Sequence, residues 1–346
     1  MPYIDRISLQ LFESNDVLNL RIAGGQIDMQ GRSIDVGSYT FLKENEQKGN
    51  YRVLRWRAAS TDAYYPNINC PDKVLAKLFD TPEFRQALSL AINRKDINEL
   101  VWSGLGKPRQ ASPIPGSPEY DAELEQTWTE YDPAKANALL DGLGLAKKPD
   151  GTRTRSDGKT LEVTVQHISV AGSAADDAHQ RVKKYWEAIG VKTVITYVDR
   201  SLYEQRNHNG EVEIGFWGFD RCSVVKADPG RWLGTIDDGP WAPNYGHWYD
   251  QNSYKREEPP TDHPIREIWK LWEQTQLEPD EAKRNALFKQ LLGIHKRAPY
   301  AIGVVGEKVA PIVVGNNFRN VRDGYIWDDT LRGDGVQNPQ QFFIKK

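Results

Sequence analysis

The stretch EIGFWGFD, which ends at Asp220, brings together residues suited to holding a ligand. Apolar and other residues alternate through it, which predicts a β-strand, and that strand delivers Trp217, Phe219 and Asp220 to its end. Flat aromatic faces suit a ligand with one apolar side and a polar rim, and a partly desolvated carboxylate makes a strong charge-assisted hydrogen bond. The alternative is that Trp217 lies in the core and that Asp220 caps the following turn. We expect these residues to form one wall of a binding cleft.

Aromatic residues are frequent in the same part of the chain. There are 11 Trp and 15 Tyr, and six of the Trp fall between residues 217 and 272. Residues 226–260 are rich in aromatic residues, Gly and Pro and show little periodicity, as expected of a long functional loop. Either a large core uses Trp as filler, or aromatic faces line a cleft.

The sequence carries no recognisable signature of catalysis or metal binding. No Gly-x-Ser-x-Gly nucleophile motif occurs, and SGLGKP at residues 103–108 is too short for a phosphate loop. The six His are far apart, and no two of them have the four-residue spacing of a helical metal site. Cys70 and Cys222 are expected to be small buried side chains, with a disulfide between them as the alternative. We therefore predict a protein that is not an enzyme and that needs no metal or other cofactor.

The overall composition is that of an ordinary globular protein. The 346 residues allow two domains or one large α/β body, and 27% of them are charged, with a net charge of −3. Because the basic residues are spread along the chain, we expect no nucleic-acid partner. No apolar run approaches the ~20 residues that a membrane helix needs.

Helical and strand-like patterns alternate along the chain, which predicts an α/β fold. Two strands flank an amphipathic helix between residues 161 and 198, as in a β-α-β unit. Another strand is expected in MPYIDRISLQLF, which lacks the basic start and the cleavage site of a signal peptide. Helices are predicted over residues 82–93, 132–141, 176–189, 262–277 and 280–297.

Taken together and in order, these segments resemble the C-terminal part of the family 5 extracellular solute-binding proteins, which serve oligopeptide- and dipeptide-type ABC importers. The resemblance extends over most of residues 3–310, and it is specific as a linked series rather than in any single motif. It is carried mainly by the segments YIDRISLQLFESNDVLNLRIAGGQIDM, LAKLFDTPEFRQALSLAINRKDINELVWSGLGKP, YDPAKANALLDGLGL and QRVKKYWEAIGVKTVITYVDRSLYEQRNHNGEVEIGFWGFD.

The resemblance implies a periplasmic-binding-protein-like (class II) clamp, in which two lobes close on a ligand. Residues 1–60 would form part of the first lobe, residues 61–300 the second, ligand-binding lobe, and residues 301–346 the return to the first lobe. Such a protein is periplasmic or lies at the cell surface, and it delivers its ligand to the permease subunits of the importer. Family members carry a long section before the YIDRISLQ strand. We therefore expect an N-terminally truncated chain with uncovered apolar surface, weak ligand binding and a tendency to associate.

The resemblance also suggests roles for individual residues. In peptide-binding members, the strand that matches EIGFWGFD ends in a Trp and an Asp, and the Asp holds the N-terminal amine of the ligand. Trp217 and Asp220 match these positions. Other members stack sugars on aromatic rings, and four aromatic residues of the long loop are candidates for stacking: Trp232, Trp241, Tyr245 and Trp248. The ligand is therefore expected to be an oligopeptide or an oligosaccharide.

The resemblance favours a transport protein over two alternatives. The first is a chemosensory or signalling receptor built on the same clamp, and the second is a hydrolase with an unrecognised set of catalytic residues. If Asp220 is a cleft residue, Asp220→Asn should weaken ligand binding and hardly change the stability of the protein. Trp217→Ala should also weaken binding.

Overall fold

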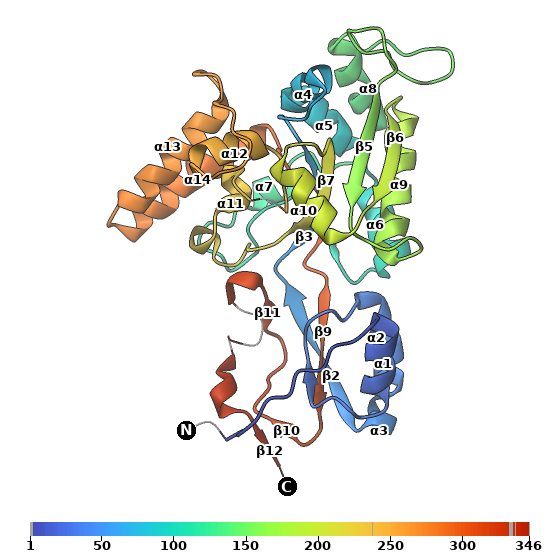
Figure 1. Cartoon of the computed structure of the whole chain (residues 1–346), viewed down its shortest axis with the longest axis vertical. Helices are drawn as coiled ribbons and strands as arrows, with labels where there is room; N and C mark the ends of the chain where they lie inside the picture. The colour runs from blue at the N-terminus through green and yellow to red at the C-terminus, as the bar shows by residue number, and fades with distance from the viewer. Residues whose placement is uncertain (1–2, 237, 332–334, 336, 346) are drawn as a thin grey trace.

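The computed structural model describes residues 3–236, 238–331, 335 and 337–345. The chain forms two bodies along the long axis of the molecule (Figure 1). The upper body is built on a six-stranded sheet, and the lower body on a four-stranded sheet. The chain passes between them from β2 (Tyr51–Ala58) to β3 (Thr61–Pro66), and again from β8 (Ile302–Gly306) to β9 (Val309–Gly315). The predicted α/β class is confirmed.

The upper sheet places the stretch EIGFWGFD near the junction of the two bodies. Its strand order is β4-β8-β3-β7-β5-β6. β7 (Ile214–Phe219) lies parallel to β5 (Glu162–His167) and antiparallel to β3, with Phe219 opposite Thr61. β5 is also parallel to β6 (Lys192–Tyr197), and helix α9 (Ala174–Ala188) connects the two, so the predicted β-α-β unit is confirmed. The short strand β4 (Lys107–Pro108) pairs with β8 at the edge.

Capping and burial explain where the helices lie. The Ser173 and Asp132 side chains accept hydrogen bonds from the first turns of α9 and α8 (Pro133–Gly142). Gly190, just after α9, has a φ of +88°, a left-handed conformation that glycine adopts without steric cost. The indole of Trp186 is fully buried and donates a hydrogen bond to the Leu88 carbonyl at 3.0 Å. The capping residues and the buried apolar face thus both explain the position of α9.

All five predicted helices are present. The helix predicted over residues 82–93 ends early, as α5 (Pro82–Leu90), because Asn93 caps the next helix, α6 (Arg94–Trp102). α13 (Pro264–Leu277) and α14 (Glu281–Arg297) pack side by side at one edge of the upper body (Figure 1). The other helices of this body are α4 (Lys73–Asp80), α7 (Ala122–Gln126), α10 (Arg200–His208), α11 (Gly230–Leu233) and α12 (Pro243–Tyr249).

The lower sheet buries apolar side chains on both faces. Its order is β1-β9-β2-β11, with β1 (Met29–Gln30) and β11 (Ile326–Trp327) at the edges. Val53 and Leu54 are neighbours on β2, yet they belong to two different apolar clusters, as expected from the two-residue period of a strand. The helices and strands that complete this body are α1 (Asn15–Ala23), α2 (Tyr39–Glu44), α3 (Glu46–Gly49), β10 (Phe318–Arg319) and β12 (Phe343–Ile344).

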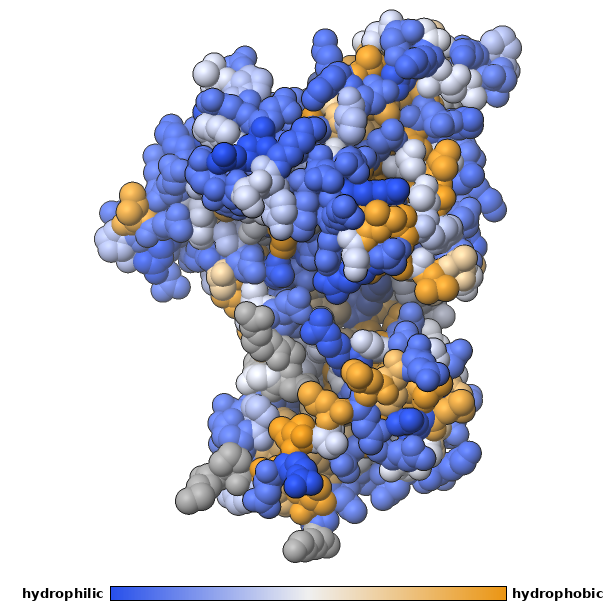
Figure 2. Space-filling view, viewed as in Figure 1, coloured by the Kyte–Doolittle hydropathy of each residue, from blue (hydrophilic) through white to orange (hydrophobic). Residues whose placement is uncertain are grey.

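The strand predicted at the start of the chain is wrong. Residues 3–13 are irregular, and the residues Ile7, Leu9 and Leu11 are 78%, 90% and 97% exposed. Alternating apolar residues form a strand only beside a pairing partner, and this segment pairs with no strand among the described residues. Figure 2 shows hydrophobic residues gathered over much of this face of the lower body. Uncovered apolar surface is therefore present, whereas self-association and weak binding remain predictions.

The upper sheet includes residues beyond 300, where the second lobe was expected to end, and the division into lobes remains a prediction. β8 pairs with β3 and β4 in the upper sheet, so the chain returns to the lower body only after Gly306. Strand pairing depends on residues far away in the sequence, and periodicity alone does not indicate which sheet a strand joins. The long aromatic region, residues 226–260, also contains the short helices α11 and α12.

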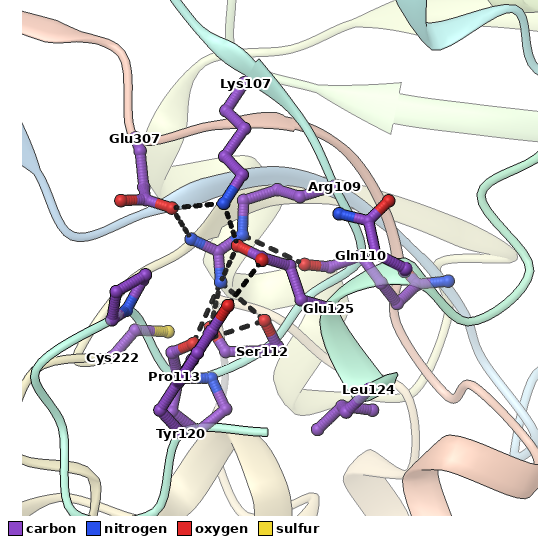
Figure 3. A network of polar contacts seen from close by, with 12 residues as sticks. Lys107, Arg109, Gln110, Ser112, Pro113, Tyr120, Leu124, Glu125, Cys222 and Glu307 are labelled. Carbon is purple, nitrogen blue, oxygen red and sulfur yellow. Dashed lines mark hydrogen bonds and ion pairs between the residues drawn. The ribbon is translucent and has the colours of Figure 1, made fainter. Parts of the chain in front are cut away.

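A buried group of charges lies where the chain crosses between the bodies (Figure 3). Glu307 directly follows β8, and its carboxylate contacts the buried guanidinium of Arg109 and lies 3.1 Å from Arg57 of β2. Glu125 lies 3.4 Å from Arg109 and 2.8 Å from Lys107. The crossings also bond to each other directly, since the Glu307 amide donates to the Ser60 carbonyl at 3.0 Å. Glu307 thus connects the lower sheet to the upper body through paired charges.

Replacing Glu307 with Gln should destabilise the protein. Arg109 is fully buried, and Glu125 alone would remain to balance its charge. We expect a loss of about 3 kcal/mol, at the lower end of the cost of removing one partner of a buried ion pair. Urea unfolding measures this loss. Glu130→Gln is the matched control, because the Glu130–Lys135 pair is exposed and should contribute less than about 1 kcal/mol. Equal losses in the two variants would contradict the prediction.

The stability that Glu125 provides should disappear in acid. Burial alone would raise the pKa of Glu125, but hydrogen bonds from Lys107 and Tyr120 and the charge of Arg109 outweigh burial and lower it. A lowered pKa means that the ionised form stabilises the fold above the unfolded-state pKa of about 4.3, and that this contribution is lost as the pH falls through the folded-state pKa. Glu125→Gln should therefore destabilise the protein at pH 7 and much less near pH 3. Urea titrations at both pH values measure the difference, and an unchanged gap would refute the assignment.

Candidate functional site

β7 ends beside the junction, and its last side chains point into different surroundings. Trp217 is partly exposed and stacks on Tyr203 of α10, with ring centroids 5.7 Å apart and planes 16° apart. The guanidinium of Arg200 lies over the Trp217 ring, 5.2 Å from its centroid. Phe219 is buried and packs edge-on against Trp232 at 4.6 Å. Of the two aromatic residues, Trp217 is partly exposed, with Tyr203 and Arg200 against its ring, and Phe219 belongs to the core.

Asp220 forms a close ion pair with a buried arginine. The Nε atom of Arg231 lies 2.6 Å from the Asp220 carboxylate, and its Nη1 atom lies 2.8 Å from the carboxylate of Asp238. The Arg231 side chain is only 1% exposed, whereas Asp220 and Asp238 remain 17% and 20% exposed. When both carboxylates are ionised, the group of Asp220, Arg231 and Asp238 carries one net negative charge. We call this group the acidic triad.

Burial at the acidic triad changes the proton affinity of Asp238. Burial raises the pKa of Asp238, and the nearby charge of Asp220 raises it further, while Arg231 opposes both effects. Burial raises the pKa of the Tyr65 hydroxyl well above its usual value. The nearby charges of Arg231, Asp238 and Asp220 also act on this pKa. The Tyr65 hydroxyl and Nη2 of Arg231 are buried without a hydrogen-bond partner. This is a low-dielectric site in which a second cationic group would be stabilised.

The turn after Asp220 has an unusual backbone conformation. Arg221 has a φ of +63°, which costs a residue with a side chain roughly 1–2 kcal/mol. The Nε atom of Arg221 lies 3.2 Å from the Asp228 carboxylate and 3.8 Å from the Asp220 carboxylate, so Arg221 faces both acidic side chains. The turn directs the chain from β7 into α11, which carries Arg231. It thereby brings Arg231 back to Asp220.

The aromatic residues of the long loop do not converge on Asp220. Trp232 and Trp241 are buried, and both pack against His295 of α14, with centroids 5.3 and 5.8 Å from that ring. A cavity of about 10 Å³ beside Phe219 and Trp232 has room for one water molecule at most. Tyr245 and Trp248, on α12, are partly buried. Tyr245 packs against His263, and Trp248 stacks on Trp269 of α13. A stacking role for these residues remains untested.

Sequence reasoning missed three residues of the site. They are Arg231 and Asp238 of the acidic triad and Tyr203, which supports Trp217. The sequence signal that could have identified Arg231 and Asp238 is the presence of charged residues in an aromatic segment that is otherwise expected to be buried. Both cysteines are free and buried, as the first reading of Cys70 and Cys222 expected. Among the described residues, no group of three or more His, Cys, Asp or Glu is placed to hold a metal ion, and no helix is long and apolar enough to cross a membrane.

The structure changes the stability expected for Asp220→Asn. We first expected little effect, because a cleft residue is not packed into the core. Asp220 instead pairs with a buried guanidinium, so the substitution weakens the charge balance of Arg231 while Asp238 remains. We now expect a loss of about 1–3 kcal/mol. Thermal and urea unfolding without ligand measure it, with Asp228→Asn as the control, since Asp228 is more exposed and bonds the partly exposed Arg221. Wild-type stability of Asp220→Asn would contradict this revision.

Comparison with known proteins gives a consistent picture. A di/tripeptide-binding protein of Pseudomonas aeruginosa is 28% identical over 262 residues, which cover 70% of this chain and 43% of that protein. The glutathione-binding protein GsiB of Salmonella typhimurium is 36% identical over 126 residues, 36% of this chain and 22% of that protein. The solved structure of an oligopeptide-binding protein, OppA, matches with a TM-score of 0.73 and 35% identity over 97% of this chain and 56% of that one.

The comparisons bear on the fold and on the family. The chain spans about half or less of the length of these relatives. The fit to a solved oligopeptide-binding protein confirms the predicted periplasmic-binding-protein-like fold. The family described as bacterial extracellular solute-binding proteins, family 5 Middle, matches residues 1–222 of the 346. This chain therefore belongs to the family 5 bacterial extracellular solute-binding proteins.

Proposed function

We propose that this chain is the solute-binding component of an ABC importer, and that it captures a peptide beside Asp220 and delivers it to the permease subunits. Membership of an extracellular solute-binding family supports this role and a location outside the cytoplasmic membrane. The relatives named as binding di- and tripeptides, glutathione and oligopeptides all have ligands of one chemical class. The same relatives are named as binding proteins, and we expect no catalytic turnover.

The acidic triad carries the proposal. Two carboxylates share one buried guanidinium, which leaves one negative charge in excess within the triad. Arg221 lies 3.8 Å from Asp220 and 3.2 Å from Asp228, so the three carboxylates of this region still outnumber its two guanidinium groups by one. A peptide's N-terminal ammonium would balance that charge, and a charge-assisted bond to Asp220 is about twice as strong as a neutral one. Trp217, which is partly exposed near the same strand end, would contact the first residue of the peptide. The anchor would bind the main chain of the peptide and leave its side chains unspecified.

The burial of the other aromatic residues favours a peptide over an oligosaccharide. Stacking a sugar requires ring faces open to the ligand. Phe219, Trp232 and Trp241 are 1%, 1% and 0% exposed, and all three pack within the core. Trp217 and Phe216 of β7 and Tyr245 and Trp248 of α12 are partly buried, with other side chains packed against them. Partly covered rings suit a row of stacked sugars poorly, whereas the Asp220 carboxylate suits an amine.

Blocking the ligand's amine tests this function without altering the protein. Acetylation removes the positive charge from a peptide such as Ala-Ala-Ala, so Asp220 would lose its partner. We expect the affinity of the full-length protein to fall at least about 30-fold, because truncating one side of a buried charged pair costs about 2–5 kcal/mol. Titration calorimetry measures both affinities.

Two further ligands complete the experiment. A tripeptide with a C-terminal amide keeps its amine, and it serves as the control for chemical blocking at the other end. An oligosaccharide panel tests the competing ligand class. Equal affinity for free and acetylated peptides, or binding of oligosaccharides alone, would overturn the proposal.

A further inference from the structure

Asp328 connects the lower sheet to the turn that carries Asp220. It directly follows β11, whose residues Ile326 and Trp327 pair with Arg57 and Ala58 of β2. The Asp328 side chain extends across to the upper body, where its carboxylate accepts hydrogen bonds from the backbone amides of Arg221 at 2.9 Å and Ser223 at 3.0 Å. Asp328 is only 1% exposed. A buried carboxylate from one body therefore holds the backbone of the other.

Four donors converge on this one carboxylate. Besides the two amides, the hydroxyl groups of Ser223 and Thr330 donate to it. Arg221 bonds one carboxylate oxygen, and the other three donors share the second. An ionised carboxylate accepts bonds at both oxygens, whereas an amide places a donor at one of them. In Asp328→Asn, the side-chain NH₂ group would therefore face a backbone N–H group, that of Arg221 or that of Ser223, in either orientation of the amide.

The location of these bonds gives them a consequence for Asp220. They hold the residue directly after Asp220, in the left-handed conformation with a φ of +63°, and the residue two positions further on. Asp220 itself is fixed on its other side by β7 and through its side chain by Arg231. The direction in which the chain leaves Asp220 is thus set from the lower body.

We propose that Asp328 is a positioning residue for amine recognition, and that it holds the Asp220 carboxylate in its binding orientation only while the two bodies are docked at this point. This inference rests on the proposed function, because it assigns Asp328 a role through Asp220. A binding group works when its supporting residues hold it close to the productive geometry. Loss of the Asp328 bonds frees the turn, and Asp220 then samples orientations that do not meet the ammonium group. Asp328 also makes the ligand site sensitive to the relative position of the two bodies.

A double-mutant cycle in the full-length protein tests the inference. The four proteins are wild type, Asp328→Asn, Asp220→Asn and the double variant, each titrated with Ala-Ala-Ala and with its N-acetylated form. We expect Asp328→Asn to weaken binding of the free peptide roughly tenfold, which corresponds to about 1.4 kcal/mol, and to leave binding of the acetylated peptide unchanged. In the Asp220→Asn background the same substitution should cost nothing further, because coupled residues are not additive. Asp329→Asn removes the same charge from the neighbouring residue and should bind both peptides as wild type does.

The possible failures are distinguishable. Equal weakening of both peptides by Asp328→Asn, persisting in the Asp220→Asn background, would make Asp328 a structural residue only and overturn the inference. If Asp220→Asn weakens the free peptide but Asp328→Asn does not, the inference fails while the proposed function stands. If neither acetylation nor Asp220→Asn matters, the proposed function fails and the inference with it. Should Asp328→Asn not fold, Ser223→Ala removes one hydroxyl donor and leaves the carboxylate largely satisfied. It should lower the affinity for the free peptide roughly two- to threefold, which corresponds to less than half of the free-energy change of a tenfold loss. The affinity for the acetylated form should not change.

Discussion

The contact between Glu307 and the buried guanidinium of Arg109 constrains how the two bodies meet. Arg109 has no access to water, so its charge is tolerated only while carboxylates face it. Glu307 provides one of these carboxylates from the crossing itself, and it also lies beside Arg57 of the lower sheet. A large displacement of either crossing would leave a charge buried and unpaired. The junction therefore favours a defined geometry, and the end of β7 lies next to it.

The acidic triad uses the same kind of chemistry with the opposite balance. At the junction, two carboxylates face Arg57, Lys107 and Arg109, so positive charge is in excess. In the acidic triad, two carboxylates share Arg231, so negative charge is in excess. Arg109 and Arg231, to which the carboxylates of these two groups pair, are both buried, and a charge imbalance around a buried group has a larger effect than at the surface. Under the proposed function, this excess of negative charge is what a peptide amine would meet.

Asp328 relates these two regions to each other. Asp328 follows β11, an edge strand of the lower sheet, and its carboxylate accepts hydrogen bonds from the turn between β7 and α11. Strand crossings alone would leave that turn free to move relative to the lower body. Hydrogen bonds from a buried carboxylate restrict it, and they also stabilise the left-handed conformation of Arg221. Placement of Asp220 and docking of the bodies are thus parts of one arrangement.

Local patterns in the sequence determined the elements of this protein. The helix that contains Trp186 could be predicted because a capping Ser173, an apolar stripe and Gly190 are all encoded within a short segment. The strand that delivers Trp217 and Asp220 could be predicted for the same reason, and so could the family, from the order of such segments. Only the tertiary structure decided which elements pair and which charges meet. Residues 3–13 have a strand pattern without a partner, and Arg231 and Asp328 reach Asp220 and its turn through contacts between distant parts of the chain. Burial and ion pairing depend on those distant neighbours, whereas the periodicity of the sequence indicates only the local backbone conformation.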